Sequence, residues 1–259
     1  MVLDFGYKHL TGLAWLCSLI AIALITLLTL KKKLKLGESF DKAVIRYTCC
    51  FMWAWEVVKT VRMINFEDYG PVGHYPMWMA PFHLCSMGFY AYMILGSKKK
   101  RKIEEFIKPF TYAALMIGAL ISLVMPAAAG LLGTVDNWSL CFDNILPYQT
   151  WLYHGSLLFI SFYMVLSGFY RPRLRDIFKG IAVLSITAAF AQALNYIFEG
   201  SGADFMTLRY GNGNPFAFLL NGENPIMYYV VLAAVSFGGI ALIISATVGI
   251  KALAHKIKK

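Results

Sequence analysis

The chain has 259 residues, of which 59% are hydrophobic and only 15% are charged. A soluble domain has about 25% charged residues, so the composition excludes an ordinary soluble protein and indicates an integral membrane protein. The net charge of +10 comes from short basic clusters between apolar runs. Such clusters orient membrane proteins in the bilayer, and they argue against a nucleic-acid partner.

Seven apolar runs approach the length that a helix needs to cross a membrane, which is about 20 residues. We therefore expect an all-α fold, with residues 1–259 forming a single seven-transmembrane-helix bundle. The first run does not look like a cleaved signal peptide, because Asp4 precedes any basic cluster and lysines follow the run. The expected helices are Leu10–Leu30, Ala43–Ile64, Ala80–Leu95, Ile107–Met125, Tyr148–Tyr170, Ile177–Phe198 and Ile226–Ile250.

Basic clusters follow the first, third, fifth and seventh runs, so all of them fall on one side of the predicted bundle. The positive-inside rule places that side in the cytoplasm, with the N-terminus outside and the C-terminus cytoplasmic. The outer side carries the longer loops, Asn65–Met79, Ala127–Pro147 and Glu199–Pro225. Long loops are often functional, so we expect the functional site there. No internal repeat is visible, which argues against a transporter built on inverted repeats.

The third run opens with two residues that can carry chemistry. We expect Pro81 in its first helical turn, where the missing N–H is tolerated, and His83 and Cys85 just below the membrane surface. Residues two apart point to different sides of a helix, so these two do not form a pair with each other. Cys85 alone is better explained as a small apolar side chain in the core.

His154 is expected at a similar depth, about 9 Å inside the outer end of the fifth run. The neighbouring Gly155 would allow another group to approach closely. A cysteine and a histidine at one depth fit a nucleophile and its base, in which the imidazole takes the thiol proton and the thiolate attacks an acyl carbonyl. An ordinary hydrogen bond between packed helices is the alternative.

Glu56 lies roughly 12 Å below the outer end of the second run. An acid at that depth faces either a cavity or a partner, and Lys59, three residues away, can pair with it on one helix face. We therefore keep two interpretations: Glu56 lines a functional cavity, or the two residues form a structural ion pair.

The outer end of the sixth run and the loop beyond it supply further polar residues. Gln192 and Asn195 are three apart and can share a helix face, from which an amide can orient the imidazole or bind an oxyanion. Arg209 is a rare basic residue on the outer side, and its natural partner is a phosphate. A loop salt bridge with Asp204 is the alternative.

Several of these segments resemble one family when taken together. Pro81-Phe82-His83-Leu84-Cys85 resembles the LPLHLC motif of the YwaF-like bacterial integral membrane proteins, and His154-Gly155 resembles their His-Gly pair in helix five. Asn195-Tyr196, Asp204-Phe205-Met206, Pro215 and Pro225 resemble their outer NY…NFM…P…P segment. The sequence departs from the family at Phe82, usually Leu, and at Asp204, often Asn.

That family is similar to a eukaryotic transmembrane acyltransferase that remodels ether phospholipids. The resemblance implies Cys85 as the acyl-accepting nucleophile and His154 as its base. We expect a phospholipid acyltransferase or acylhydrolase in the bacterial plasma membrane, with its site on the extracytoplasmic side, phospholipid and lysophospholipid as partners, and no metal or organic cofactor. Asn195 completes the expected catalytic set, and His83, Glu56, Gln192, Arg209 and Tyr196 are expected to bind substrate. The alternative function is a non-catalytic receptor or transporter that binds a lipid or small solute in the same cavity.

Overall fold

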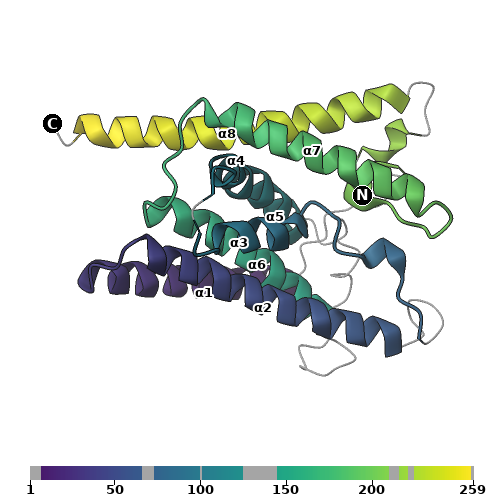
Figure 1. Cartoon of the computed structure of the whole chain (residues 1–259), viewed down its shortest axis with the longest axis horizontal. Coiled ribbons are helices and arrows are strands. Elements are labelled where there is room, and N and C mark those ends of the chain that lie inside the picture. The colour runs from purple at the N-terminus through teal and green to yellow at the C-terminus, as the bar shows by residue number, and fades with distance from the viewer. Residues whose placement is uncertain are drawn as a thin grey trace.

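The computed structural model of the chain describes residues 7–65, 73–99, 101–124, 145–209, 216–220 and 225–257. These residues form helices joined by turns, and no strand occurs among them, which confirms the all-α prediction (Figure 1). The elements are α1 (Tyr7–Lys33), α2 (Glu38–Asn65), η2 (Met77–Met79), α3 (Met87–Leu95), α4 (Glu104–Pro109), η3 (Phe110–Ala114), α5 (Leu115–Val124), α6 (Ile145–Leu166), α7 (Asp176–Ile197), η6 (Phe205–Thr207), η7 (Ala217–Leu219) and α8 (Pro225–Ile257).

Four helices in the described part are long and apolar enough to cross a membrane: Gly12–Lys33, Glu104–Val124, Asp176–Ile197 and Ile226–Ile257. Helix α2 is as long as these, but charged residues recur along it. Helix α3 has only nine residues, too few to span a bilayer by itself. The count of seven spans and their direction in the membrane therefore stay predictions.

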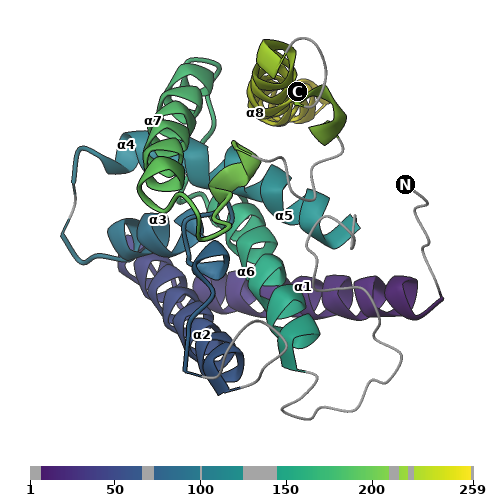
Figure 2. The same ribbon diagram turned by 90° about the vertical axis from the view of Figure 1, so that its right-hand side faces the viewer.

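The helix formed by α4, η3 and α5 runs through the middle of the molecule. Helices α1, α2, α3 and α6 lie on one side of it, and α7 and α8 lie on the other (Figures 1 and 2). Pro109 lacks the N–H that a regular helix needs, and a π-helical turn follows it directly. Gly180 of α7 packs here, since a Cβ atom on it would lie 3.6 Å from the Pro109 carbonyl carbon.

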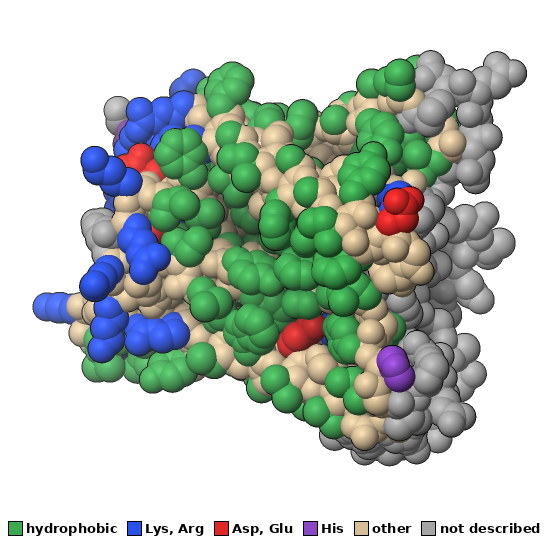
Figure 3. All heavy atoms as spheres, turned by 45° about the vertical axis from the view of Figure 1, so that its right-hand side comes forward, with side chains coloured by type: hydrophobic (Ala, Val, Ile, Leu, Met, Phe, Trp, Pro, Cys, Tyr) green, Lys and Arg blue, Asp and Glu red, His purple; other side chains and the backbone are tan. Residues whose placement is uncertain are grey.

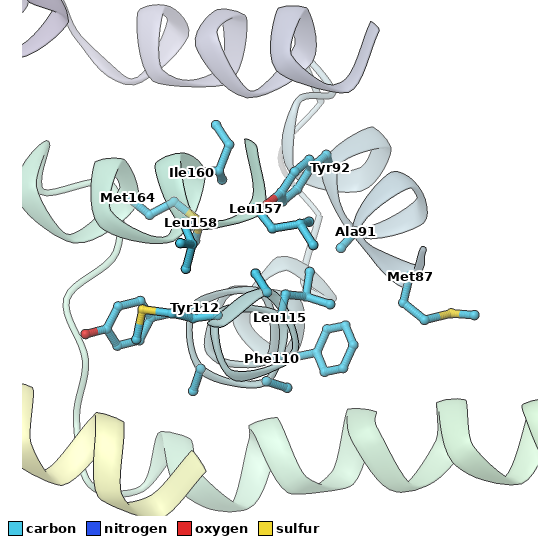
Figure 4. Packing of buried hydrophobic residues seen from close by; sticks show 14 of the residues in the cluster. Met87, Ala91, Tyr92, Phe110, Tyr112, Leu115, Leu157, Leu158, Ile160 and Met164 are labelled. Atoms are coloured by element: carbon cyan, nitrogen blue, oxygen red, sulfur yellow. The ribbon is translucent and has the colours of Figure 1, made fainter. Parts of the chain in front are cut away.

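Large apolar side chains fill the space between α3, α6 and this central helix. Tyr92, Leu115 and Leu157 are fully buried there (Figure 4). Gly88 of α3 permits the close contact with α6, because a Cβ atom at that position would lie 2.5 Å from Leu157 Cδ2. Burying such side chains supplies the main packing energy of the fold.

Lysine and arginine side chains gather at one end of the molecule, beside a broad apolar band (Figure 3). We call this the basic end. Buried ion pairs join its helices: Lys31 of α1 lies 2.7 Å from Asp41 of α2, and Lys42 of α2 lies 2.8 Å from Glu104 of α4. Tyr163 of α6 also donates a hydrogen bond to Asp41. The gathering of lysine and arginine side chains at one end agrees with the prediction that the basic clusters share one side of the bundle.

Candidate functional site

The sequence places a helix over Ala80–Leu95, but the regular helix begins only at Met87. The preceding residues form turns, so Pro81 does not occupy a first helical turn, and that prediction is wrong. The residue before a proline is pushed out of the α region, and Ala80 is extended, with φ −59° and ψ 148°. His83 and Cys85 therefore lie on a non-helical stretch, residues 80–86, which we call the broken segment.

Backbone carbonyls released by this break need hydrogen-bond donors, because unsatisfied polar groups are costly in a membrane protein. The Met79 carbonyl accepts from the Lys59 ammonium at 3.1 Å and from the Tyr75 hydroxyl at 2.8 Å. The Lys59 ammonium lies 2.6 Å from the Glu56 carboxylate, and both of these α2 side chains are buried. Of the two interpretations kept for Glu56, the ion pair with Lys59 is present, and it holds the start of the broken segment.

Tyr75, in the connection that follows α2, remains a donor at ordinary pH. Burial first, and then the negative charge of Glu56, raise the pKa of its phenol well above the usual value. The protonated hydroxyl is the form that donates to the Met79 carbonyl.

The Cys85 thiol, which is partly buried, contacts the central helix. Its Sγ lies 3.9 Å from Ser122 Oγ of α5. Gly118, one turn earlier on α5, leaves room for the sulfur, since a Cβ atom there would lie 3.3 Å from Sγ. The Cys85 carbonyl accepts a hydrogen bond from the Tyr153 hydroxyl of α6 at 3.2 Å. Ser122, Gly118 and Tyr153 were not predicted from the sequence, although Gly118 and Ser122 are four apart and hence share a helix face.

His154 follows Tyr153 on α6, and their rings lie 5.6 Å apart. Its Nδ1 lies 2.8 Å from the Thr150 carbonyl. A carbonyl only accepts hydrogen bonds, so Nδ1 carries a proton and Nε2 of the neutral ring is the basic nitrogen. Cys85 and His154 both lie in the described residues, and no hydrogen bond joins them. Tyr153, which precedes His154 on α6, is hydrogen-bonded to the Cys85 backbone carbonyl.

Residues 199–209, which we call the strap, cover the broken segment from the α7 side. The Phe205 ring is fully buried and lies 5.3 Å from the Phe82 ring and 5.5 Å from the His83 ring. Met206 and Thr207 have φ values of 56° and 57°. That left-handed backbone is unfavourable for a β-branched residue such as Thr207, so contacts around the strap must hold it.

Asn195 supplies two of those contacts. It is fully buried, its Oδ1 accepts from the Phe205 N–H at 2.7 Å, and its Nδ2 donates to the Phe205 carbonyl at 3.1 Å. The same Nδ2 lies 3.3 Å from Gln192 Oε1. Both ends of the Asn195 amide thus bind the strap backbone in this structure.

Arg209 closes the strap onto α7. Its guanidinium donates to the Asn195 carbonyl at 2.8 Å and pairs with Glu199. The Asp204 carboxylate accepts from the Arg209 backbone N–H at 2.8 Å. The exposed Tyr196 ring lies 5.8 Å from the guanidinium carbon. Tyr228 and Tyr229 of α8 donate to strap carbonyls at Thr207 and Leu208.

The structure therefore brings most of the predicted site residues to one end of the bundle. His83 and Cys85 lie on the broken segment, Glu56 supports that segment through Lys59, and Asn195 and Arg209 hold the strap above it. Cys141, Asn214, Pro215 and Asn224 lie outside the described residues. Within the described ranges, no group of three or more His, Cys, Asp and Glu side chains is placed to hold a metal ion.

The model of the TMEM164 family matches residues 5–245, which is nearly the whole chain. No curated protein and no solved structure matches the chain.

Proposed function

The chain belongs to the TMEM164 family of membrane proteins, and we propose that it is a phospholipid acyltransferase or acylhydrolase that works through Cys85 and His154. The observation that carries the proposal is the setting of Cys85. Its thiol contacts a hydroxyl of α5, and the Cys85 residue lies on irregular backbone whose carbonyl accepts a hydrogen bond from Tyr153, the neighbour of His154 on α6. A buried structural cysteine needs none of these features.

The chemistry follows from the two residues. His154 Nε2 takes the thiol proton, the Cys85 sulfur attacks an ester carbonyl, and the carbon–oxygen ester bond breaks. The leaving lysophospholipid oxygen receives the proton from the imidazolium. Water or the hydroxyl of a lysolipid then attacks the thioester and gives a proton to His154. The carbon–sulfur bond breaks, and the thiolate regains the proton.

The first step requires the thiol to turn from Ser122 towards His154. Hydrogen bonds between catalytic groups are often absent without substrate and form in the substrate complex. A non-helical segment adjusts more readily than a regular helix, because no ladder of i to i−4 bonds fixes it. The broken backbone at Cys85 is therefore consistent with this movement.

The other predicted residues take supporting roles in the proposal. His83 and Glu56 line the region below the strap, and Tyr196 and Arg209 meet the lipid head group. Asn195 reaches an oxyanion or the imidazole only after releasing Phe205, so its part in catalysis, and that of Gln192, depends on opening of the strap. The proposed location is the bacterial plasma membrane, with the site on the extracytoplasmic side.

Intact-protein mass spectrometry tests the proposal directly. Purified protein is incubated with a phospholipid of defined acyl chains. We expect a mass increase of one acyl chain that hydroxylamine removes and that Cys85→Ser abolishes. Cys49→Ser is the matched control, because Cys49 is a buried cysteine whose thiol donates to the Phe89 carbonyl at 3.6 Å within the packed core.

His154→Ala should slow acylation of Cys85 without lowering the amount of folded protein. If wild-type protein gains no acyl group from any of several phospholipid classes, and a lipid or solute co-purifies instead, the alternative of a binding protein replaces the enzyme. Loss of acylation in Cys49→Ser as well would place the reaction elsewhere.

A further inference from the structure

Arg46 of α2 is a cation for which the described residues provide no anion. Its Nε is buried and has no hydrogen-bond partner. The neighbouring carboxylates pair with lysines: Asp41 with Lys31, and Glu104 with Lys42. The Arg46 guanidinium therefore needs an anionic partner, because an unpaired charge at membrane depth is costly.

The remaining carboxylates at the basic end are also matched. Glu38 lies 3.9 Å from Lys42, and both Glu105 and Asp176 lie within 3.7 Å of Lys179. Arg46 thus takes no part in the ion pairs that join the helices at this end.

Arg46 lies near enough to the basic end for its side chain to reach lipid phosphates there. It follows Asp41 by five residues, which places it about 7.5 Å further along α2. An arginine side chain can cover such a distance by extending towards the interface. Tyr47, the next residue, is 74% exposed, as expected of an aromatic side chain at the membrane–water boundary.

The end of α3 packs closely against the backbone of α2 at Arg46. A Cβ atom on Gly96 would lie 3.1 Å from both Cα and Cβ of Arg46, so the end of α3 passes directly over the arginine backbone. The chain then continues through Lys98 and Lys99, which are exposed. Each basic residue near the bilayer surface adds attraction for anionic lipid.

We propose that Arg46 is the phosphate ligand of a phospholipid-binding site where α2 meets the C-terminal end of α3. A guanidinium matches the two free oxygens of a phosphodiester with paired hydrogen bonds. The ligand is a membrane glycerophospholipid that is held at the basic end and is not the substrate of Cys85. This site stands apart from the proposed enzyme activity, so each can fail without the other.

Native mass spectrometry of the full chain in a mild detergent, titrated with phosphatidylglycerol, tests the site. We expect one tightly bound lipid in the wild type. Arg46→Met should weaken its binding about tenfold or more, because a charge-assisted hydrogen bond contributes about 1.5–3 kcal/mol. Arg46→Lys keeps the charge and safeguards folding. Its affinity for the lipid should lie between those of the wild type and Arg46→Met, because an ammonium lacks the fork geometry of a guanidinium.

Arg175→Met is the matched control. Arg175 is exposed at the same end, so its loss changes the net charge equally and should leave the tight lipid bound. Equal retention by wild type and Arg46→Met would overturn the proposal, as would equal loss in Arg175→Met. Inorganic phosphate should not displace the lipid at millimolar concentration; displacement would identify a site for soluble anions instead.

Discussion

The basic end and the opposite end of the bundle stabilise their buried polar groups in different ways. At the basic end, buried charges pair with charges on neighbouring helices, as Lys31 does with Asp41 and Lys42 does with Glu104. At the opposite end, polar side chains bind backbone groups: Lys59 and Tyr75 bind the Met79 carbonyl, and Asn195 binds both backbone groups of Phe205.

This difference follows the regularity of the backbone. Where helices are regular, their own carbonyls and N–H groups are satisfied internally, and side chains are available for one another. Where the chain is irregular inside a membrane, side chains must satisfy the backbone. Irregular segments kept in this way can move when a few contacts are exchanged, which suits the end that carries Cys85.

The largest expected effects separate the two ends. Lys59→Met leaves the buried Glu56 carboxylate without its ammonium and should lower the free energy of unfolding by about 3–5 kcal/mol. Asp41→Leu leaves the half-buried Lys31 ammonium without its carboxylate and should lower it by less. Only Lys59→Met also removes a donor from the Met79 carbonyl, so only this variant of the two should speed up modification of Cys85 by N-ethylmaleimide. Unfolding in mixed detergent micelles measures the free energy of unfolding, and peptide-level mass spectrometry measures the rate at which Cys85 is labelled.

Two controls sharpen this test. Tyr75→Phe removes one neutral donor from the Met79 carbonyl and should cost only about 1 kcal/mol. Glu105→Leu removes an acid that is mostly exposed and should cost at most about 1 kcal/mol. Faster labelling of Cys85 in Asp41→Leu would show that the two ends are coupled, and the comparison would then fail.

A smaller effect is expected from the strap. Asn195→Leu keeps the side-chain size but leaves the Phe205 N–H and carbonyl buried without partners, which should cost about 2–4 kcal/mol. Hydrogen–deuterium exchange should rise in residues 203–209 while the basic end of α2 stays protected, because local opening needs less free energy than global unfolding.

Gln192→Leu is the companion variant for the strap. It removes only the 3.3 Å contact to Asn195, so exchange in the strap should change little. Exchange that rises across the whole chain in Asn195→Leu would show that Asn195 stabilises the bundle instead of the strap.

The all-helical fold could be predicted because long apolar runs are visible in the sequence itself. The spacing of Glu56 and Lys59 allowed the ion pair that the structure shows, but it did not decide between that pair and a cavity-lining acid. The sequence missed the break before α3 because the residues from Ala80 to Leu95 remain apolar, although Pro81 disfavours a helical conformation for Ala80.

The partners of Asn195 and Cys85 could not be predicted in the same way. Asn195 binds the backbone of Phe205, and that contact depends on the left-handed conformations of Met206 and Thr207, which no residue type there signals. Ser122 meets Cys85 only because α5 passes beside the broken segment. Both contacts are properties of the packed chain.

The smallest expected effect concerns the room around the thiol. Gly118→Ala adds a methyl group 3.3 Å from Cys85 Sγ and 3.4 Å from Leu84 Cδ2. The broken segment has no helical ladder to resist a shift of a few tenths of an ångström, so the stability cost should stay near 1 kcal/mol. The thiol, however, loses space to turn, and labelling of Cys85 should slow several-fold.

Gly238→Ala on α8 is the reference for a glycine-to-alanine change in a helix, because the added methyl group meets nothing within 4 Å. It should raise the free energy of unfolding by up to about 1 kcal/mol and leave the labelling of Cys85 unchanged. Gly118→Ala that labels at the wild-type rate would mean that the thiol never turns across α5. In that case the movement required for Cys85 to reach His154 would have to come from the strap side, where Phe205 lies against His83.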